Sequence, residues 1–380
     1  MKRQKQGIDI LKLNTGNPAT FGFGLPDSIK NALMEHMQDG VGYCDFKGMP
    51  QARQAICDYE TSKGIKGITP DDVFIGNGVS EVVSFALTPL LNDGDEVLVP
   101  SPSYSLWGNS VYLEDGKPVF YTCDEQANWY PDIQDIRSKI TDKTKAIVII
   151  NPNNPTGVLY PKELLLEIIQ VARESGLLIF ADEIYDRLVM DGKQHISLAS
   201  LTEDVPVITL NGLSKSHCLC GYRCGWMVIS GPRELTEDYR QGIIQLTSLR
   251  LCANTMAQIV IPAALDDMET PASMVRPGGR IYEQREATVR ELEKIDGLSF
   301  VKNDAAFYVF PKLDVKKFNI TNDKQFAHDL LDATNILLVP GSGFDWKDPD
   351  HFRIVMLPQA DILSDAIRRM GTFLDGYKQK

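Results

Sequence analysis

One short loop of the chain carries the residues best suited to covalent chemistry. Asn211–Gly225 reads N-G-L-S-K-S-H-C-L-C-G-Y-R-C-G and lies between two apolar runs, Val205–Leu210 and Trp226–Ile229. These flanks predict a loop between two buried strands. Burial disfavours the charged form of a lysine, so Lys215 in this loop is suited to react with carbonyl groups. Arg223, eight residues further on, can bind a phosphate through its planar guanidinium.

An amine able to form a Schiff base, close to an arginine able to bind phosphate, suggests pyridoxal 5'-phosphate as a cofactor. Taken alone, the loop also fits an ordinary surface loop with two solvated basic residues. The same loop contains His217, Cys218, Cys220 and Cys224. Their spacing, with no second distant pair, is not that of a structural zinc site. We therefore expect thiols that fill a tight loop, and no metal.

A second motif supplies an acid. Leu177–Tyr185 reads L-L-I-F-A-D-E-I-Y, an apolar run that predicts a buried strand ending at Asp182. Ligands of parallel sheets bind beyond the carboxyl ends of the strands, which is where Asp182 would lie. A carboxylate there would keep a pyridine nitrogen protonated, and Tyr185 could hydrogen-bond a ring hydroxyl. The alternative is a solvated acidic pair, Asp182 and Glu183, at the end of a strand.

Two further loops follow predicted strands. Gly76–Gly78 connects a strand, Val73–Ile75, to a helix, Ser80–Leu91. Its backbone N–H groups would therefore face a bound phosphate, or would simply belong to a capped helix. Asn151–Gly157 reads N-P-N-N-P-T-G and also follows an apolar run; its prolines make it rigid. Asn154 in this loop is the candidate donor to a phenolate oxygen.

Arg353 lies among apolar neighbours in the stretch H-F-R-I-V-M. An arginine in such surroundings normally needs an anion. A substrate carboxylate would serve, and so would an internal salt bridge with one of the many acidic residues. The residues alone favour the salt bridge.

The elements around these motifs predict an α/β fold. Short apolar runs alternate with helical patterns up to about residue 230, which is typical of a mostly parallel sheet sandwiched by helices. After about Met274 the pattern changes to a long charged helix, short strands and a closing helix, Ala360–Tyr377. We therefore predict a large domain over residues 40–275 and a smaller α+β domain formed by residues 1–39 and 276–380.

Composition excludes several classes of protein. The 380-residue chain has a net charge of −12, so nucleic acid is not an expected partner. No apolar run approaches the roughly 20 residues of a membrane span, and no signal-peptide core follows the basic residues at the start. Seven cysteines are an odd number in a long chain, which does not suggest a disulfide framework. We expect a cytoplasmic protein that acts on small molecules.

Taken in order, Gly76–Ser80, Tyr104, N-P-N-N-P-T-G, A-D-E-I-Y, S-K and Arg223 resemble the class I/II aminotransferases of the fold-type-I pyridoxal-phosphate family. The similarity covers nearly the whole chain. Within the family the chain looks most like the bacterial alanine (glutamate–pyruvate) aminotransferases. The segments L-N-T-G-N-P, G-Y-C-D-F-K-G, S-L-R-L-C-A-N and P-G-G-R-I-Y-E-Q-R carry this closer resemblance.

The resemblance implies roles for residues around the cofactor. Lys215 would bond the aldehyde and Asp182 would pair with the pyridinium nitrogen, and both would be catalytic together with Tyr185. The remaining residues would bind the ring or the phosphate of the cofactor: Asn154 and Tyr185 at the ring oxygen, Tyr104 stacked on the ring, and Val79, Ser80, Ser214 and Arg223 at the phosphate. Gly212 stands where many relatives have a phosphate-binding serine, and Ser214 is the candidate to compensate.

The resemblance also implies a substrate site and a partner. Gly16, Asn154 and Arg353 would bind the amino acid and its α-carboxylate, and Arg250 could bind the distal carboxylate of a dicarboxylic substrate. Tyr43 would reach the phosphate of a neighbouring subunit, so a homodimer with shared active sites is expected. The N-terminal arm with an I-R-G-P-like segment that usually closes over substrate in these relatives is not present in this sequence.

The expected reaction is transamination between an amino acid, alanine or glutamate, and a 2-oxo acid, pyruvate or 2-oxoglutarate, by a ping-pong mechanism. Another reaction on the same cofactor, such as β-elimination from a cysteine conjugate, is an alternative. A cofactor-sensing regulatory module is a second one, although such regulators carry a DNA-binding domain for which the chain has neither room nor a basic stretch.

Overall fold

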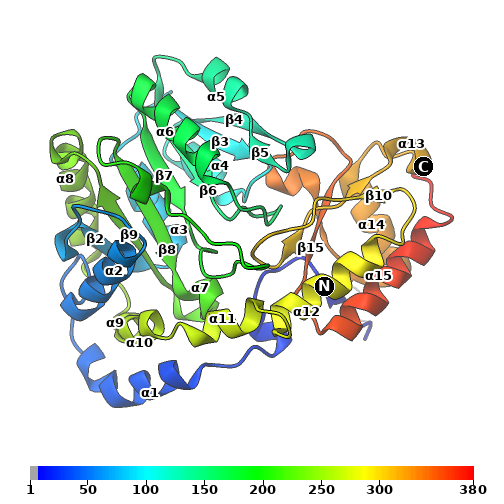
Figure 1. Ribbon diagram of the computed structural model, residues 1–380, viewed down its shortest axis with the longest axis horizontal. Helices are drawn as coiled ribbons and strands as arrows, with labels where there is room; N and C mark the ends of the chain where they lie inside the picture. The colour runs from blue at the N-terminus through cyan, green and yellow to red at the C-terminus, as the bar shows by residue number, and fades with distance from the viewer. Residues whose placement is uncertain (1–6) are drawn as a thin grey trace.

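The computed structural model describes residues 7–380, and within them the largest sheet has eight strands in the order β2-β9-β8-β7-β6-β3-β4-β5 (Figure 1). The strands of this sheet are β2 (Val73–Asn77), β3 (Glu96–Ser101), β4 (Lys117–Asp124), β5 (Tyr130–Pro131), β6 (Thr144–Ile150), β7 (Leu178–Asp182), β8 (Val207–Gly212) and β9 (Cys224–Ser230). Strands β4, β3, β6, β7 and β8 pair in parallel, whereas β9 is antiparallel to both β8 and β2. The sheet is therefore mostly parallel, as predicted.

This pairing brings the functional loops to one edge of the sheet. Strand β7 ends at Asp182, which lies next to Ile150 at the end of β6. Strand β8 ends at Gly212, opposite Gly225 in β9, and β9 begins where β2 ends. The loops after β2, β6, β7 and β8 consequently open on the same side, as expected for ligand sites of parallel sheets.

Both faces of the large sheet are covered by helices because its strands are apolar on both sides. In β6, Ile147 and Ile149 face a core that includes α6 (Lys162–Ser175), while Ala146, Val148 and Ile150 face the opposite core. The helices that contribute to this opposite core are α3 (Val79–Leu87), α4 (Leu106–Leu113) and α8 (Arg233–Arg250). Helix α5 (Ile133–Lys139) adds Ile136 to the α6 side.

A third group of helices packs at the β2–β9 end of the sheet, at the lower left in Figure 1. These helices are α1 (Asp27–His36), α2 (Pro50–Ser62), α9 (Thr255–Ile259) and α10 (Ile261–Asp266). They bury Ile29, Ile56 and Ile261 against Val73 and Trp226 of the strands.

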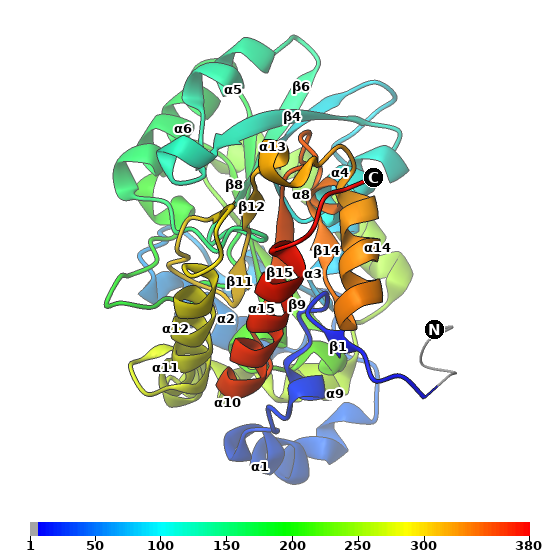
Figure 2. The ribbon, with the colours of Figure 1, turned by 90° about the vertical axis from the view of Figure 1, so that its right-hand side faces the viewer.

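The smaller part of the molecule, at the right of Figure 1, has its own core. Its strands are β1 (Leu11–Lys12), β10 (Leu298–Ser299), β11 (Tyr308–Val309), β12 (Lys312–Leu313), β13 (Ile336–Leu337), β14 (Val339–Pro340) and β15 (Phe352–Val355). Its helices are α12 (Arg280–Leu292), α13 (Val315–Phe318), α14 (Asp323–Thr334) and α15 (Ala360–Leu374), with α11 (Glu269–Val275) leading into α12 (Figure 2).

The N-terminal segment joins this smaller part, because β1 pairs in parallel with β13. Strand β15 lies between β11 and β14 in an antiparallel sheet and carries Arg353. The domain boundaries near residues 39 and 275 stay a prediction.

The α/β fold class predicted from the sequence is confirmed, but one long helix is not predicted by its apolar pattern. Helix α8 buries Thr236, Arg240, Ile243 and Thr247, so most of its inward face is polar. Arg240 is tolerated there because it forms an ion pair with Asp72 and donates to the backbone oxygen of Ile229. A buried face made of threonine and arginine leaves little hydrophobic period to detect.

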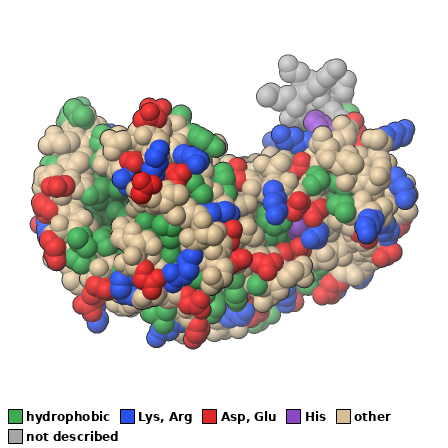
Figure 3. All heavy atoms as spheres, turned by 90° about the horizontal axis from the view of Figure 1, so that it is seen from above, with side chains coloured by type: hydrophobic (Ala, Val, Ile, Leu, Met, Phe, Trp, Pro, Cys, Tyr) green, Lys and Arg blue, Asp and Glu red, His purple; other side chains and the backbone are tan. Residues whose placement is uncertain are grey.

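No helix among residues 7–380 is long and apolar enough to cross a membrane. On the face seen in Figure 3, acidic and basic side chains are interspersed.

Candidate active site

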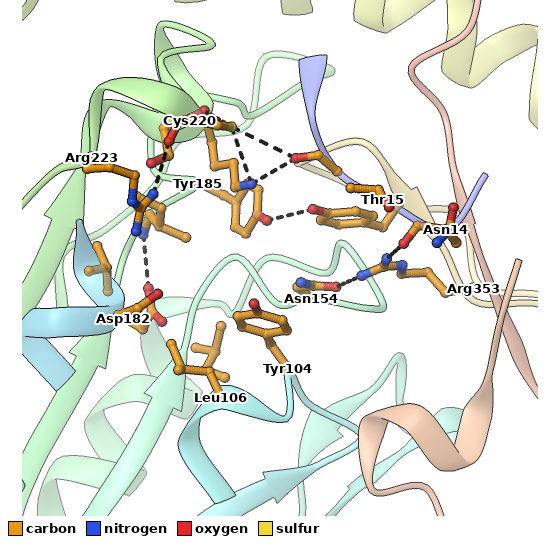
Figure 4. A pocket seen from close by; sticks show the side chains of 18 residues that line it. Asn14, Thr15, Tyr104, Leu106, Asn154, Asp182, Tyr185, Cys220, Arg223 and Arg353 are labelled. Atoms are coloured by element: carbon orange, nitrogen blue, oxygen red, sulfur yellow. Dashed lines mark hydrogen bonds between the residues drawn. The ribbon is translucent and has the colours of Figure 1, made fainter. Parts of the chain in front are cut away.

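The loops at the edge of the large sheet and the smaller part of the molecule enclose a cavity of ≈ 300 Å³. Most of the residues that the sequence predicts for the site line it: Gly16, Val79, Ser80, Tyr104, Asn154, Asp182, Tyr185, Ser214, Lys215, Arg223 and Arg353. Figure 4 shows Asp182 and Arg223 on one side of the cavity and Asn14 and Arg353 on the other. Tyr43 and Arg250 do not line it.

Lys215 lies in a one-turn helix, α7 (Leu213–Ser216), directly after β8. Its half-buried side chain donates from Nζ to the backbone oxygen of Gly16 at 2.9 Å, and the Sγ of Cys220 lies 3.8 Å away. The residue before this helix must be small, because a Cβ on Gly212 would lie 2.6 Å from the backbone oxygen of Cys224. Close packing of β8 against β9 therefore accounts for the glycine at position 212.

Asp182 is buried at the end of β7, with 5% of its surface exposed. Its carboxylate accepts hydrogen bonds from the indole Nε1 of Trp107 at 3.1 Å and from the backbone N–H of Ile184 at 3.3 Å. Burial raises the pKa of Asp182 to about 6, although the hydrogen bonds from Trp107 and Ile184 act to lower it. Within residues 7–380 this carboxylate forms no ion pair, so it would gain from a cation bound in the cavity. The solvated acidic pair considered from the sequence is not what forms here.

An anion-binding corner lies at the N-terminus of α3. Gly78 is the N-cap, with φ 84° and no side-chain cap, so the first N–H groups of the helix face the cavity beside Val79 and Ser80. Arg223 lies against this turn, because a Cβ on Gly78 would be 2.2 Å from its Nη2. Only glycine allows the guanidinium and the helix N-terminus to come this close. Together they can bind a phosphate.

Arg353 forms the opposite end of the cavity. It is buried, and its guanidinium donates from Nη1 to Oδ1 of Asn154 at 2.9 Å and from Nη2 to the backbone oxygen of Asn14 at 2.6 Å. Its Nε has no partner, and no carboxylate among the described residues forms an ion pair with it. The internal salt bridge that its position alone favours is therefore not formed. A buried guanidinium without a counter-charge is suited to a carboxylate ligand.

Tyr308 belongs to the same cavity and was not predicted from the sequence. Its hydroxyl lies 2.8 Å from the hydroxyl of Tyr185, and both side chains are buried. It lies in A-A-F-Y-V-F, where every neighbour is apolar or aromatic. Such a stretch predicts a core strand, and no sequence signal marks the one side chain that faces a ligand. Trp107, which donates to Asp182, was also not predicted, because this contact joins residues 75 apart in sequence.

The two predicted residues outside the cavity have different environments. Tyr43 is 86% exposed, which leaves it free to meet another subunit. Arg250 instead donates to Glu81 Oε2 at 2.6 Å and to the backbone oxygen of Phe46 at 3.0 Å. Its charge is therefore already balanced within the chain by Glu81.

A second group of ionisable side chains does not line the cavity. Glu183, Asp186 and His195 form the one group among the described residues that could hold a metal ion. Lys63 already fills it, with its Nζ 2.7 Å from Glu183 and 3.2 Å from Asp186. The ammonium supplies the positive charge that a metal would otherwise bring.

The cavity therefore offers a carbonyl-reactive amine, a buried acid and two separate anion sites. Residues 8–367 match the family described as aminotransferase class I and II, and the chain belongs to this family. It is an enzyme that transfers an amino group between an amino acid and a 2-oxo acid. The resemblance inferred from the motifs is confirmed.

Individual relatives are similar over nearly their whole length. The chain is 50% identical to the glutamate-pyruvate aminotransferase of Haemophilus influenzae over 379 residues, which cover 100% of this chain and 94% of that protein. Among solved structures, an aminotransferase from Escherichia coli has a TM-score of 0.98 at 47% identity, with 100% of this chain and 94% of that chain covered. The alanine aminotransferase of Pyrococcus furiosus has a TM-score of 0.94 at 41% identity, with 98% and 94% covered.

Proposed function

We propose that the cavity binds pyridoxal phosphate and that the enzyme exchanges amino groups between alanine or glutamate and pyruvate or 2-oxoglutarate. The observation that carries the proposal is that Asp182 and Lys215 line one cavity whose opposite sides carry Arg223 and Arg353. The printed name of the Haemophilus influenzae relative, glutamate-pyruvate aminotransferase, supports the same pair of substrates. It does not favour the elimination or sensor alternatives.

The unbalanced groups of the cavity fit this cofactor. Pyridoxal phosphate supplies an aldehyde and a ring that draws electrons from a bound amino acid. Asp182 would hold the proton on the ring nitrogen, and this cation would offset the burial that raises the pKa of the carboxylate. Arg223 and the N-terminus of α3 would hold the phosphate, with Ser214 beside them. Tyr104, which is partly exposed at the rim, would stack on the ring.

Lys215 would act as both the anchor and the proton carrier. Once released by an incoming amino acid, its neutral amine would move the proton from the substrate Cα to the cofactor. The contact of Nζ with the backbone oxygen of Gly16 keeps this amine beside the Asn14–Gly16 segment. Asn14 in turn accepts from Arg353, so the amine and the carboxylate site are held by one short stretch of chain.

Arg353 would orient the amino acid through its α-carboxylate. Its two hydrogen bonds to Asn154 and Asn14 fix the plane of the guanidinium, while Nε is left without a partner. A fixed fork selects a carboxylate by two parallel hydrogen bonds. The backbone of Gly16, at the same end of the cavity, would supply a further donor.

We also propose a cytoplasmic homodimer in which Tyr43 reaches the partner's phosphate site. Three apolar side chains shortly before Tyr43 in the sequence are exposed: Met34, Met37 and Val41. An exposed apolar surface of this kind is suited to a protein interface. Sedimentation of the purified protein as a monomer at micromolar concentration would exclude the shared site.

The test of the function is the variant Lys215→Ala. We expect it to lose the visible absorption of covalently bound cofactor and to lose transamination of alanine with 2-oxoglutarate. Lys66→Ala is the matched control, because Lys66 is a solvent-exposed lysine paired with Glu203, and it should retain both. Turnover by Lys215→Ala would refute the role of this lysine. A panel of amino donors against pyruvate and 2-oxoglutarate would identify the substrate pair.

A further inference from the structure

Tyr308 contacts both halves of the proposed site. It lies on β11, which pairs with β15 so that Tyr308 is opposite Val355. Only 2% of its surface is exposed. Its hydroxyl lies 2.8 Å from the hydroxyl of Tyr185, and the two rings meet edge to face with centroids 5.6 Å apart. Tyr308 therefore supports the tyrosine expected to contact the ring oxygen of the cofactor.

The same side chain also supports the carboxylate end of the cavity. The guanidinium carbon of Arg353 lies 4.6 Å from the centre of the Tyr308 ring, within the range of a cation–π contact. The Tyr308 hydroxyl also abuts Gly16, because a Cβ on that glycine would lie 2.3 Å from it. One buried side chain thus touches Tyr185, Arg353 and Gly16.

The pair of hydroxyls can be arranged in two ways, because only one proton lies between the two oxygens. If Tyr185 donates to Tyr308, its proton is used and the Tyr185 oxygen faces the cavity as an acceptor. If Tyr308 donates to Tyr185, the Tyr185 proton is free to point into the cavity. A negatively charged ring oxygen would select the second arrangement, since hydrogen bonds to a charged acceptor are stronger than those between neutral groups.

We propose that Tyr308 is a positioning residue that donates to Tyr185 and so holds the Tyr185 hydroxyl as a donor to the ring oxygen of the bound cofactor. This inference rests on the proposed function. Consecutive hydroxyls in a chain polarise one another, so the donation from Tyr308 strengthens the donation from Tyr185. A tyrosine that merely filled space would have no such effect on the cofactor.

The experiment is a titration of the holoenzyme without amino acid, following the visible absorption of the cofactor attached to Lys215 as a function of pH. A hydrogen bond donated to the ring oxygen withdraws charge, so the neighbouring nitrogen holds its proton less tightly. Tyr308→Phe keeps the ring against Arg353 and removes only the hydroxyl. We expect the midpoint to rise by a few tenths of a pH unit, because only the cooperative part of the Tyr185 hydrogen bond, roughly 10–30% of it, is lost.

The decisive comparison is a double-mutant cycle. Tyr185→Phe should raise the midpoint further than Tyr308→Phe, and the double variant should match Tyr185→Phe alone, because Tyr308 acts through Tyr185. Tyr239→Phe is the control, since its hydroxyl bonds the backbone oxygen of Ala86 away from the cavity; it should titrate like the wild type.

Two outcomes overturn the inference. One is an unchanged midpoint in Tyr308→Phe. The other is that the change Tyr308→Phe raises the midpoint as much in the Tyr185→Phe protein as it does in the wild type. Both leave the proposed function intact if the wild type shows the titration. If the wild type binds no pyridoxal phosphate at Lys215, the proposed function itself fails, and the role of Tyr308 fails with it.

Discussion

Asp182 and Glu183 are consecutive carboxylates at the end of β7, and they lie in opposite environments. Asp182 faces the cavity, where the indole of Trp107 donates to it but no cation of the described chain pairs with it. Glu183 does not line the cavity, and it accepts from Lys63 Nζ at 2.7 Å and from the hydroxyl of Ser197 at 2.9 Å. Asp182 therefore lacks a counter-charge within the described chain, whereas Glu183 has one.

The same contrast separates two regions of the molecule. In the buried ion network formed by Glu60, Lys63, Glu183 and Asp186, the Lys63 ammonium lies within 3.2 Å of all three carboxylates. In the cavity, by contrast, the buried charges of Asp182 and Arg353 have no ionic partner among the described residues. Buried charges are costly unless they are paired. A buried charge without a partner in the chain therefore indicates a ligand-binding site. A buried charge that is paired within the chain indicates a role in stabilising the fold.

The largest expected effect concerns Asp182→Asn. An amide cannot hold a proton on the ring nitrogen, so we expect transamination to fall by about 10³-fold or more, the scale of losing a key electrostatic contact. Initial rates with alanine and 2-oxoglutarate at saturating cofactor measure this. An activity within tenfold of the wild type would contradict the assignment.

The same variant should stabilise the cofactor-free protein at alkaline pH. The pKa of Asp182 is raised to about 6, above its unfolded value. Its contribution to stability is therefore complete below about pH 3.8 and is lost as pH rises through about 6. Asparagine has no charge to bury, so at pH 8 the cofactor-free variant should exceed the wild type by about 3 kcal/mol. Thermal unfolding of both proteins at pH 5 and pH 8 tests the sign.

The paired region should respond in the reverse way to loss of its central charge. Burial alone would lower the pKa of Lys63, but the surrounding carboxylates raise it well above its usual value, so the ammonium persists at neutral pH. Lys63→Met leaves these buried carboxylates without a cation and should cost about 3–5 kcal/mol in the free energy of unfolding. Urea unfolding of the wild type and of Lys63→Met measures this loss in the free energy of unfolding. Lys66→Met, in an exposed pair with Glu203, should leave the free energy of unfolding almost unchanged, because water screens an exposed ion pair. Equal losses in the two variants would contradict the contrast.

The sequence predicts much of the cavity because local pattern and chain direction suffice there. An apolar run ending in Asp182, in a sheet of parallel strands, places that carboxylate at the ligand-binding edge. The loop with Lys215 and Arg223 lies at the same edge for the same reason. These residues could be found because each follows or precedes a recognisable buried strand.

The pairing of charges could not be predicted, because it depends on contacts between distant segments. The sequence offers both Arg353 and Arg250 as candidate partners of a substrate carboxylate, yet only Arg250 meets a carboxylate within the chain, that of Glu81, which is 169 residues away in sequence. The side chain of Tyr308 faces the cavity only because β11 pairs with β15. No local pattern states which of these contacts form.

Two buried arginines, one unpaired and one paired, give a further test of the contrast with a smaller expected effect. Arg353 lines the cavity without an ionic partner, whereas Arg240 is paired with Asp72. Arg353→Lys loses the planar fork that can bind a carboxylate with two bonds, so we expect KM for the amino acid and the 2-oxo acid to rise by about 10²-fold. Arg240→Lys should lower the melting temperature and leave KM unchanged. Steady-state kinetics on both variants decide this, and an unchanged KM in Arg353→Lys would remove it from the substrate site.

The smallest expected effect concerns His351, whose ring forms ion pairs with its two neighbouring carboxylates only when it is protonated. His351 is buried between Asp350, 2.7 Å from its Nδ1, and Glu125, 3.5 Å from its Nε2, with Lys312 bonded to the same Glu125. Burial alone would lower the pKa of His351, but the hydrogen bond to Asp350 and the negative charges of Asp350 and Glu125 raise it above its usual value of 6.5. The stabilisation is therefore complete below pH 6.5 and declines as pH rises through the raised pKa.

His351→Gln keeps a polar side chain of similar size but cannot take up a proton. The unfolding free energy of the wild type should therefore decline relative to that of the variant between pH 6 and pH 9, by less than the effect of Lys63→Met. Lys312, whose pKa is raised by Glu125 and Asp350 in spite of its burial, stays charged over this range and does not produce the decline. Parallel pH profiles of the two proteins would show that folding does not raise the pKa of His351, and the contrast between paired and unpaired buried charges would then exclude this cluster.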